Sequence, residues 1–209
     1  MRTCKLDWCN GKHHSKGYCQ KHYTQIKRRG HIFRYGRKEP NKVVFEEDVA
    51  KISLYDKWLN EIAQAVIDKG DYDKVKEFRW FLSKSGNYVA TISKETNRLV
   101  YLHNVIFGRK PDPERKIDLD HIDRNRLNNR KDNLRVCTRS QNQMNSFRKN
   151  NTSGVKGVTW HKHQRKWYAY ITTDYKSISL GYFKSLAQAA KVRRNAEIKY
   201  HGEYALKGV

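Results

Sequence analysis

The sequence predicts an α+β protein that is assembled from several small modules instead of one large core. Three observations support this prediction. Cysteines crowd the first 22 residues, short alternating strands dominate the middle of the chain, and a strand-rich stretch followed by an Ala-rich helix comes last. Because the residue pattern changes near residues 40 and 150, we divide the 209 residues into an N-terminal segment (1–40), a middle segment (41–149) and a C-terminal segment (150–209).

The N-terminal segment has the spacing of a small zinc finger. The pattern C-x4-C-x9-C-x2-H is formed by Cys4, Cys9, Cys19 and His22. Thiolates and an imidazole at such spacings suit a tetrahedral structural Zn²⁺. The intervening residues are polar and Gly-rich, so the metal would supply the core that about 40 residues rarely build alone. His22 is favoured as the fourth ligand because it forms a compact pair with Cys19, and His13 or His14 is the alternative.

The net charge indicates a nucleic-acid partner. Lysine and arginine number 44 against 21 acidic residues, which gives a formal charge of +23. Such a charge draws a protein to a phosphate backbone through counterion release, and it exceeds what solubility requires. We expect no membrane partner, because the sequence has no long apolar run and no basic amphipathic helix. The first basic cluster, expected to contact phosphates, is Lys27, Arg28 and Arg29.

The first residues and the cysteines also bear on the cellular compartment. Met1 is followed by polar residues, so we expect no secretory signal and a protein of the cytoplasm of a bacterial or phage-infected cell. In that reducing compartment cysteines bind metal more often than they form disulfides. Cys137 lies apart from the others and is expected to be a small core residue.

The first part of the middle segment is predicted to be β-rich. We expect short strands at 43–45 and 51–54, a hairpin over 80–92 around a Gly/Asn turn, and a strand at 98–101. A short helix should follow and end at Gly108. In this lead-in, His103 is expected to pack mainly as a core residue, and it is the second-rank candidate for the site described next.

Asp120 and His121 stand side by side at the end of an apolar/polar alternation. Hydrolysis of a phosphodiester needs a base for water and a hard cation for the charge on the phosphate and the leaving oxygen. His121 has the chemistry of the base, and Asp120 and Asn142 offer the oxygen ligands that Mg²⁺ or Mn²⁺ takes. Adjacent side chains on a strand leave opposite faces. We therefore expect the strand to end here, with a turn through the Asn-rich stretch that follows.

Residues 99–147 resemble an HNH nuclease of the homing-endonuclease type, which is built on the ββα-metal hairpin. The resemblance implies that His121 is the general base and that Asp120 is a metal ligand. It also implies that Asn133 braces the loop and that Asn142 takes the third position, which makes an H-N-N variant and favours a single Mg²⁺ or Mn²⁺.

The sequence departs from this family at two positions. The family often has glycine where Arg124 stands, so we expect the loop after His121 to be shaped differently. Asn104 stands where an arginine is common, which leaves that position without its usual role. Arg124 and Arg126 are basic residues of the loop, and we expect them to contact DNA.

The C-terminal segment is predicted to contain three strands, at about 157–160, 166–172 and 176–183, and a helix from Ser185 to about Tyr200. Over residues 153–205 this pattern resembles the AP2 DNA-binding domain. Alternation should turn Trp167, Ala169 and Ile171 toward the helix. The side chains expected to meet DNA are Lys156, Trp160, Lys162, Arg165, Tyr168, Tyr170 and Thr172. Bidentate base contacts by arginine should be fewer than in the family, because threonine stands at 159 and 172.

Together these features predict a site-specific homing endonuclease that acts on double-stranded DNA, with structural Zn²⁺ and catalytic Mg²⁺ or Mn²⁺. One active site per chain implies a monomer that nicks one strand. The alternatives are a DNA-binding regulator that does not cleave and a nonspecific defence nuclease or toxin. We expect the active site to form without residues 150–209, because its proposed members lie between 103 and 142.

Overall fold

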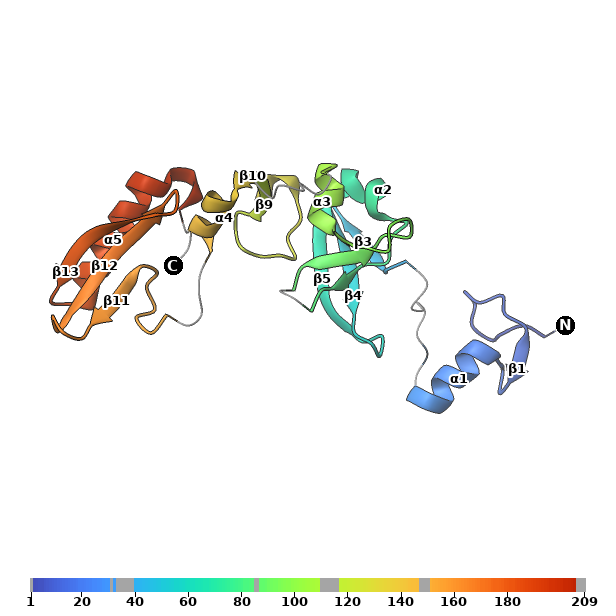
Figure 1. Ribbon diagram of the computed structural model, residues 1–209. Helices are drawn as coiled ribbons and strands as arrows, with labels where there is room; N and C mark the ends of the chain where they lie inside the picture. Colours follow the sequence, from blue (N-terminus) through green and yellow to red (C-terminus); the bar gives the residue numbers. More distant parts are fainter. Residues whose placement is uncertain are drawn as a thin grey trace.

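The computed structural model describes residues 2–30, 32, 40–84, 87–109, 117–146 and 151–205, apart from the side chain of Arg29. Within these ranges the chain forms five small antiparallel sheets and five short α-helices, which confirms the predicted α+β class (Figure 1). None of the described helices combines the length and the hydropathy that a membrane span requires.

In the N-terminal segment, a short hairpin leads directly into a helix. Strands β1 (His13–Ser15) and β2 (Tyr18–Cys19) pair around Gly17, whose φ of +84° is the left-handed conformation that glycine tolerates. Helix α1 (Gln20–Arg29) begins immediately after Cys19 and ends at Gly30. This turn of chain direction brings the start of the helix next to the cysteines.

Two three-stranded sheets form the lead-in of the middle segment. The first is made of β3 (Val43–Glu46), β4 (Val49–Tyr55) and β5 (Glu61–Asp68). The second is made of β6 (Phe81–Leu82), β7 (Val89–Ile92) and β8 (Leu99–Tyr101). A short helical stretch, η1 (Lys69–Asp71) with α2 (Tyr72–Val75), joins them, and α3 (Leu102–Phe107) follows β8 and ends at Gly108 as predicted.

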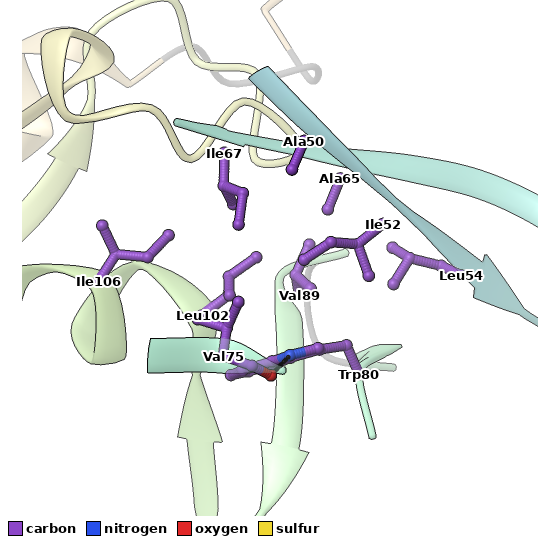
Figure 2. Close-up of a cluster of buried hydrophobic side chains, with 10 residues drawn as sticks. All are labelled: Ala50, Ile52, Leu54, Ala65, Ile67, Val75, Trp80, Val89, Leu102 and Ile106. Atoms are coloured by element: carbon purple, nitrogen blue, oxygen red, sulfur yellow. Dashed lines mark hydrogen bonds between the residues drawn. The ribbon is translucent and has the colours of Figure 1, made fainter. Parts of the chain in front are cut away.

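The main hydrophobic core lies between these elements. On β4, alternate residues Ala50, Ile52 and Leu54 are 0–1% exposed, which is the period of a strand with one buried face. Figure 2 shows these side chains facing Trp80 and Val75 across the core. The indole Nε1 of Trp80 donates to the Val75 carbonyl at 3.0 Å, so this large ring is buried without losing its hydrogen bond.

The second part of the middle segment is a β-hairpin followed by a helix. Strands β9 (Ile117–His121) and β10 (Leu134–Thr138) pair antiparallel, with Asp120 opposite Arg135. Strand β9 ends at His121, as the sequence predicted. The short η2 (Lys131–Asn133) precedes β10, and α4 (Arg139–Asn145) follows it. Thr138 and Gln141 form a reciprocal capping box that fixes where α4 starts.

The C-terminal segment is a three-stranded sheet with one helix packed on it. Its elements are β11 (Val158–His161), β12 (Lys166–Thr173), β13 (Lys176–Phe183), α5 (Leu186–His201) and η3 (Gly202–Tyr204). The Ser185 hydroxyl caps α5 by accepting from the Gln188 amide at 3.2 Å. Ala169 packs with Val158 of β11 and Ala189 of α5, so the predicted helix-facing side of β12 is confirmed there.

The register of this sheet determines the face on which Trp160, a predicted DNA contact, lies. Trp160 lies directly opposite Trp167, and Thr159 lies opposite Tyr168. Residues directly opposite each other on paired strands share a face. Trp160 therefore lies on the face of Trp167, against whose ring it packs at 5.2 Å, and this is the face that the sequence analysis turned toward the helix. The alternation of side chains along one strand does not reveal which residues of the adjacent strand lie opposite them.

Candidate active site and metal centres

His121 occupies the last position of β9, and its side chain is 3% exposed. Its Nε2 lies 3.3 Å from Asn129 Oδ1. The amide of Asn129 is oriented by its own Nδ2, which donates to the Arg126 carbonyl at 3.2 Å. Asn129 Oδ1 therefore accepts from Nε2–H, which leaves the other ring nitrogen, Nδ1, as the basic one. Burial lowers the pKa of His121, although the Asn129 hydrogen bond opposes this shift.

Aromatic rings pack around His121. The ring centroid of Tyr88 lies 6.0 Å from that of His121, and the centroid of His103 lies 5.2 Å away. Burial lowers the pKa of His103 to about 3, so this imidazole is neutral and packs as a ring, stacked on Tyr101 at 5.5 Å. On the other side, the Arg126 guanidinium lies 4.3 Å from the centre of the Tyr88 ring. His121 thus packs against the rings of Tyr88 and His103, and the Arg126 cation covers the Tyr88 ring.

Asn133 lies across the loop that connects β9 to β10. Its Oδ1 accepts from the Asp123 amide at 3.0 Å. Its Nδ2 donates to Asp123 Oδ1 at 2.9 Å and to the Asn128 carbonyl at 2.8 Å. These bonds satisfy the polar groups of a loop that has no regular pairing of its own.

The loop after His121 begins with a tight turn at Arg124. Arg124 has a φ of +64°, which is the left-handed conformation that glycine adopts most easily. Its amide donates to the His121 carbonyl at 2.9 Å, which closes the turn. The arginine therefore adopts a backbone conformation that glycine also adopts easily, and the expectation that the loop differs from the family's loop stays a prediction.

The lead-in sheet holds the same loop from outside. The backbone N–H of Asn129 donates to the Val66 carbonyl at 2.7 Å, and the backbone N–H of Val66 donates to the Leu127 carbonyl at 2.8 Å. At the end of β5, the Asp68 carboxylate accepts from Arg130 Nε at 2.9 Å and from the Lys131 amide at 2.8 Å. Sequence reasoning missed this anchor, because its partners are about 60 residues apart in the chain.

Asp120 is buried, and most of its hydrogen bonds go to one carboxylate oxygen, Oδ2. Arg135 donates to its Oδ2 through Nε at 3.1 Å and Nη2 at 2.8 Å. Asn145 Nδ2 donates to Oδ2 at 2.9 Å and approaches Oδ1 at 3.2 Å. Asn142, the predicted second ligand, instead donates to Asp118 Oδ2 at 3.2 Å. The structure therefore pairs Asp120 with Asn145 and pairs Asn142 with Asp118.

Sequence reasoning had signals for these additional residues. Asp118 precedes Asp120 by two positions, so both carboxylates leave β9 on the same face. Asn145 follows Asn142 by three positions, so both lie on one side of α4. Arg135 has no comparable local signal, because only the strand register places it opposite Asp120.

The donors on this face fit a hard divalent cation. Asp118 and Asp120 supply carboxylate oxygens, and the buried Asn145 Oδ1 has no hydrogen-bond partner among the described residues. Cys137 is the neighbouring sulfur. Burial raises its pKa to about 12, so it remains a thiol and is a poor ligand for a softer metal.

The N-terminal cysteines and His22 converge on one point. Their ligand atoms all lie within 4.8 Å of one another. Cys9 Sγ lies 3.9 Å from Cys19 Sγ, and His22 Nδ1 lies 3.4 Å from Cys4 Sγ and 3.3 Å from Cys19 Sγ. Tetrahedral zinc requires about 3.8 Å between two sulfurs and about 3.5 Å between sulfur and nitrogen. The set therefore fits Zn²⁺.

The same geometry decides between the histidines. His13 Nε2 accepts from the Gly17 amide at 3.1 Å, and His14 packs on Tyr23. Neither belongs to the cluster, whereas His22 is 1% exposed and does. Gly11 is required beside the cluster, because an added Cβ would lie 2.9 Å from Cys19 Cβ.

The predicted DNA contacts fall into separate groups. Lys27 and Arg28 are exposed at the end of α1, and the side chain of Arg29 lies outside the described residues. Arg124 and Arg126 are exposed in the loop after His121. Lys162 and Arg165 are exposed in the turn between β11 and β12. Tyr168, Tyr170 and Thr172 share the face of β12 that is turned away from α5, where the Tyr168 ring lies 5.8 Å from Tyr170 and 4.9 Å from Tyr182.

Lys156 has a role that the sequence did not predict. Its Nζ donates to the carbonyls of Gln143 and Met144 at 2.6 and 2.8 Å. These carbonyls belong to the last turn of α4, where a cation is favourable. Lys156 therefore ties the C-terminal segment to α4, which corrects the prediction that its side chain is free to meet DNA. A cavity of about 760 Å³ lies beside it, with Tyr170, Arg193 and His201 in its lining.

Comparison with known proteins agrees with this arrangement. Residues 100–144 match a family model described as HNH endonuclease. Protein 3.8 of Escherichia phage T7 is 35% identical over 88 residues, which is 42% of this chain and 72% of that protein. An uncharacterized HNH endonuclease of Acanthamoeba polyphaga mimivirus is 31% identical over 134 residues, which is 63% of this chain and 67% of that protein. No solved structure matches the chain.

The family match spans β9, the Asn-rich loop, β10 and most of α4, and so contains His121, Asp120, Asn133 and Asn142. HNH endonucleases act on DNA and use divalent metal ions, in agreement with the oxygen donors on β9 and α4. The chain belongs to the HNH endonuclease family and is a nuclease.

Proposed function

We propose that this nuclease is a site-specific homing endonuclease, which nicks one strand of double-stranded DNA per monomer with His121 as general base. The observation that supports it most is the setting of His121. The imidazole ends a strand, it is kept neutral by burial, and Asn129 holds its Nε2–H so that Nδ1 is basic. A neutral, oriented imidazole is what proton abstraction from water requires.

In this mechanism, Nδ1 of His121 takes a proton from a water molecule as the water oxygen attacks the phosphorus. The bond to the 3′ oxygen breaks as the new bond forms. Asp120 and Asn142 are proposed to hold one Mg²⁺ or Mn²⁺, with Asp118, the hydrogen-bond partner of Asn142, as a further oxygen donor on the same face of β9. The ion would neutralise charge on the phosphate and on the leaving oxygen. The bonds of Asn133 keep the loop, and with it His121, in place.

The N-terminal and C-terminal segments are proposed to bind DNA on either side of the cleavage point. The N-terminal segment is proposed to fold around Zn²⁺ and to contact phosphates with Lys27, Arg28 and Arg29. The C-terminal segment, proposed to be AP2-like, would use Tyr168, Tyr170 and Thr172 with Lys162 and Arg165. Segments that each cover a few base pairs add up to a long and therefore rare site.

A plasmid-nicking assay tests this proposal. The zinc-loaded full chain should convert supercoiled plasmid to open circles with added Mg²⁺ and not without it, and the products should share one cleaved sequence selected from a random library. His121→Ala should lose roughly 10²–10⁴-fold in rate at unchanged DNA affinity. The exposed His163 provides the matched control, because His163→Ala removes an imidazole far from β9 in sequence.

Each outcome separates the alternatives. A regulator would bind DNA tightly without nicking it under any metal. A nonspecific nuclease would cut without a shared sequence. If His121→Ala cuts as fast as the parent chain, His121 is not the base.

A further inference from the structure

We propose that Arg135 is a positioning residue, through which the end of the C-terminal segment orients Asp120 in the nuclease site. This inference rests on the proposed role of Asp120 as metal ligand. Figure 1 shows α4 between the β9–β10 hairpin and the C-terminal sheet with α5, and Arg135 of β10 bridges the hairpin and the C-terminal segment.

The first half of the bridge joins Arg135 to Asp120. The residues lie opposite each other on β10 and β9. Nε and Nη2 of Arg135 both donate to Asp120 Oδ2, at 3.1 and 2.8 Å. The two side chains are only 12% and 9% exposed, so water competes little for this pair.

The second half joins Arg135 to the residues just beyond α5. Nη1 donates to the Glu203 carbonyl at 2.5 Å, and the guanidinium carbon lies 4.4 Å from the centre of the Tyr204 ring. Nε, Nη1 and Nη2 therefore all have partners, and one face of the planar group rests on an aromatic ring. The C-terminal segment thus determines the direction in which the guanidinium points.

The consequence concerns the direction in which Asp120 can bind an ion. Arg135 and Asn145 both donate to Oδ2, whereas among the described residues Oδ1 has only the longer 3.2 Å contact with Asn145. The carboxylate is thereby held with Oδ1 as its more available oxygen. Groups that hydrogen-bond to a ligating carboxylate fix its orientation, and their loss typically costs about 10–100-fold in metal affinity or activity.

The proposed role of this bridge opposes the expectation that the site forms without residues 150–209. Their removal would leave Nη1 without the Glu203 carbonyl and the guanidinium without the Tyr204 ring. The C-terminal segment therefore contributes to the metal site as well as to the proposed binding of DNA.

The test compares variants of the zinc-loaded full chain. Tyr204→Ala removes the ring under the guanidinium, and Tyr204→Phe retains it. Arg135→Lys keeps the charge and loses the planar fork. Tyr200→Ala is the matched control, because it removes a ring from the same segment four residues earlier, where Lys199 is its cation partner. For each variant we would measure Mn²⁺ affinity by calorimetry without DNA, nicking rate at saturating DNA and Mg²⁺, DNA affinity and Tm.

We expect Tyr204→Ala and Arg135→Lys to weaken Mn²⁺ binding by about 10-fold and to slow nicking by a similar factor, with DNA affinity unchanged. Tyr204→Phe and Tyr200→Ala should match the parent chain. A purely structural role would lower Tm and leave the Mn²⁺ affinity of the folded protein unchanged, and that result would overturn the inference.

Asp120→Ala separates this inference from the proposed function. If Asp120→Ala binds Mn²⁺ as well as the parent chain, Asp120 is not the ligand and the proposed function is wrong at that residue. If Asp120→Ala loses Mn²⁺ while Tyr204→Ala and Arg135→Lys keep it, the proposed ligand stands and the positioning role is wrong.

Discussion

Asn145 donates its side-chain amide to Asp120, with Nδ2 lying 2.9 Å from Oδ2. The same nitrogen lies 3.0 Å from the His121 carbonyl and 3.4 Å from the Ile122 carbonyl. Because carbonyl oxygens only accept, these contacts fix which end of the amide faces β9. One asparagine of α4 therefore holds the end of the strand that carries both Asp120 and His121.

Asn145 and Asn142 should respond differently to truncation. Asn145 is 1% exposed, so Asn145→Ala leaves buried acceptors without a donor. This variant should lose about 1–3 kcal/mol of stability, and it should also lose cleavage activity. Asn142→Ala should abolish Mg²⁺-dependent cleavage at nearly unchanged Tm. Thermal unfolding and plasmid nicking measure both effects. Equal Tm losses for the two variants, or cleavage by Asn142→Ala at the parent rate, would contradict this division.

The N-terminal segment should contain one zinc ion per chain. Removing it with a chelator should unfold the first ~40 residues, because metal binding supplies the folding free energy of so small a segment. Elemental analysis and amide exchange over α1 are the measurements. Cys19→Ala should lose the zinc, whereas Cys137→Ala, the matched control outside the cluster, should keep it. Protein purified without chelator that contains no zinc would refute the site.

Arg124→Gly should stabilise the loop after His121. Arg124 has a φ of +64°, where glycine avoids a clash of the side chain with its own backbone. The net gain in stability should be about 0.5–1 kcal/mol, once the entropic cost of the more flexible unfolded glycine chain has been subtracted. Amide exchange of β9 and β10 reports it, with Asn125→Gly as a neighbouring control of ordinary φ. Faster exchange in Arg124→Gly would show that the arginine side chain contributes more than the backbone costs.

The C-terminal segment should lose stability in acid through His201. Burial lowers the pKa of His201, the hydrogen bond to the Thr172 carbonyl opposes this, and the charges of Arg193 and Lys156 add to it. The unfolded chain therefore binds the proton more readily. Stability should be full above pH about 6.5 and should fall, by up to about 1.4 kcal/mol per pH unit, until the folded pKa is passed. Amide exchange of β12 at pH 7.5 and 5 measures this, and His201→Gln should remove most of the difference.

The register of the C-terminal sheet allows a prediction of which face binds DNA. Tyr168→Ala should weaken DNA binding by roughly 10-fold, which corresponds to about 1.4 kcal/mol. Trp160→Ala should change it less, because Trp160 lies with Trp167 on the other face. Anisotropy titrations at one salt concentration, with Tm as a check on folding, compare the two. A larger loss for Trp160→Ala would place the DNA on the other face of the sheet.

The sequence by itself determined the local features of this protein. It predicted the α+β class, the end of β9 at His121, the helix that ends at Gly108 and the cysteine spacing of the N-terminal segment. Each of these depends on residues close together in the chain, where periodicity, capping and ligand spacing act directly.

Only the tertiary structure decided the contacts between distant residues. Arg135 lies 15 positions from Asp120 and 68 from Glu203, and its two neighbourhoods follow from strand register and from the packing of α5. Strand register and packing also decide three other features. These are the face on which Trp160 lies, the pairing of Asp120 with Asn145, and the hydrogen bonds of Lys156 to carbonyls of α4. A pattern of alternation fixes which side chains share a face of one strand, but the partner across that face is set by the register and by the burial of the whole assembly.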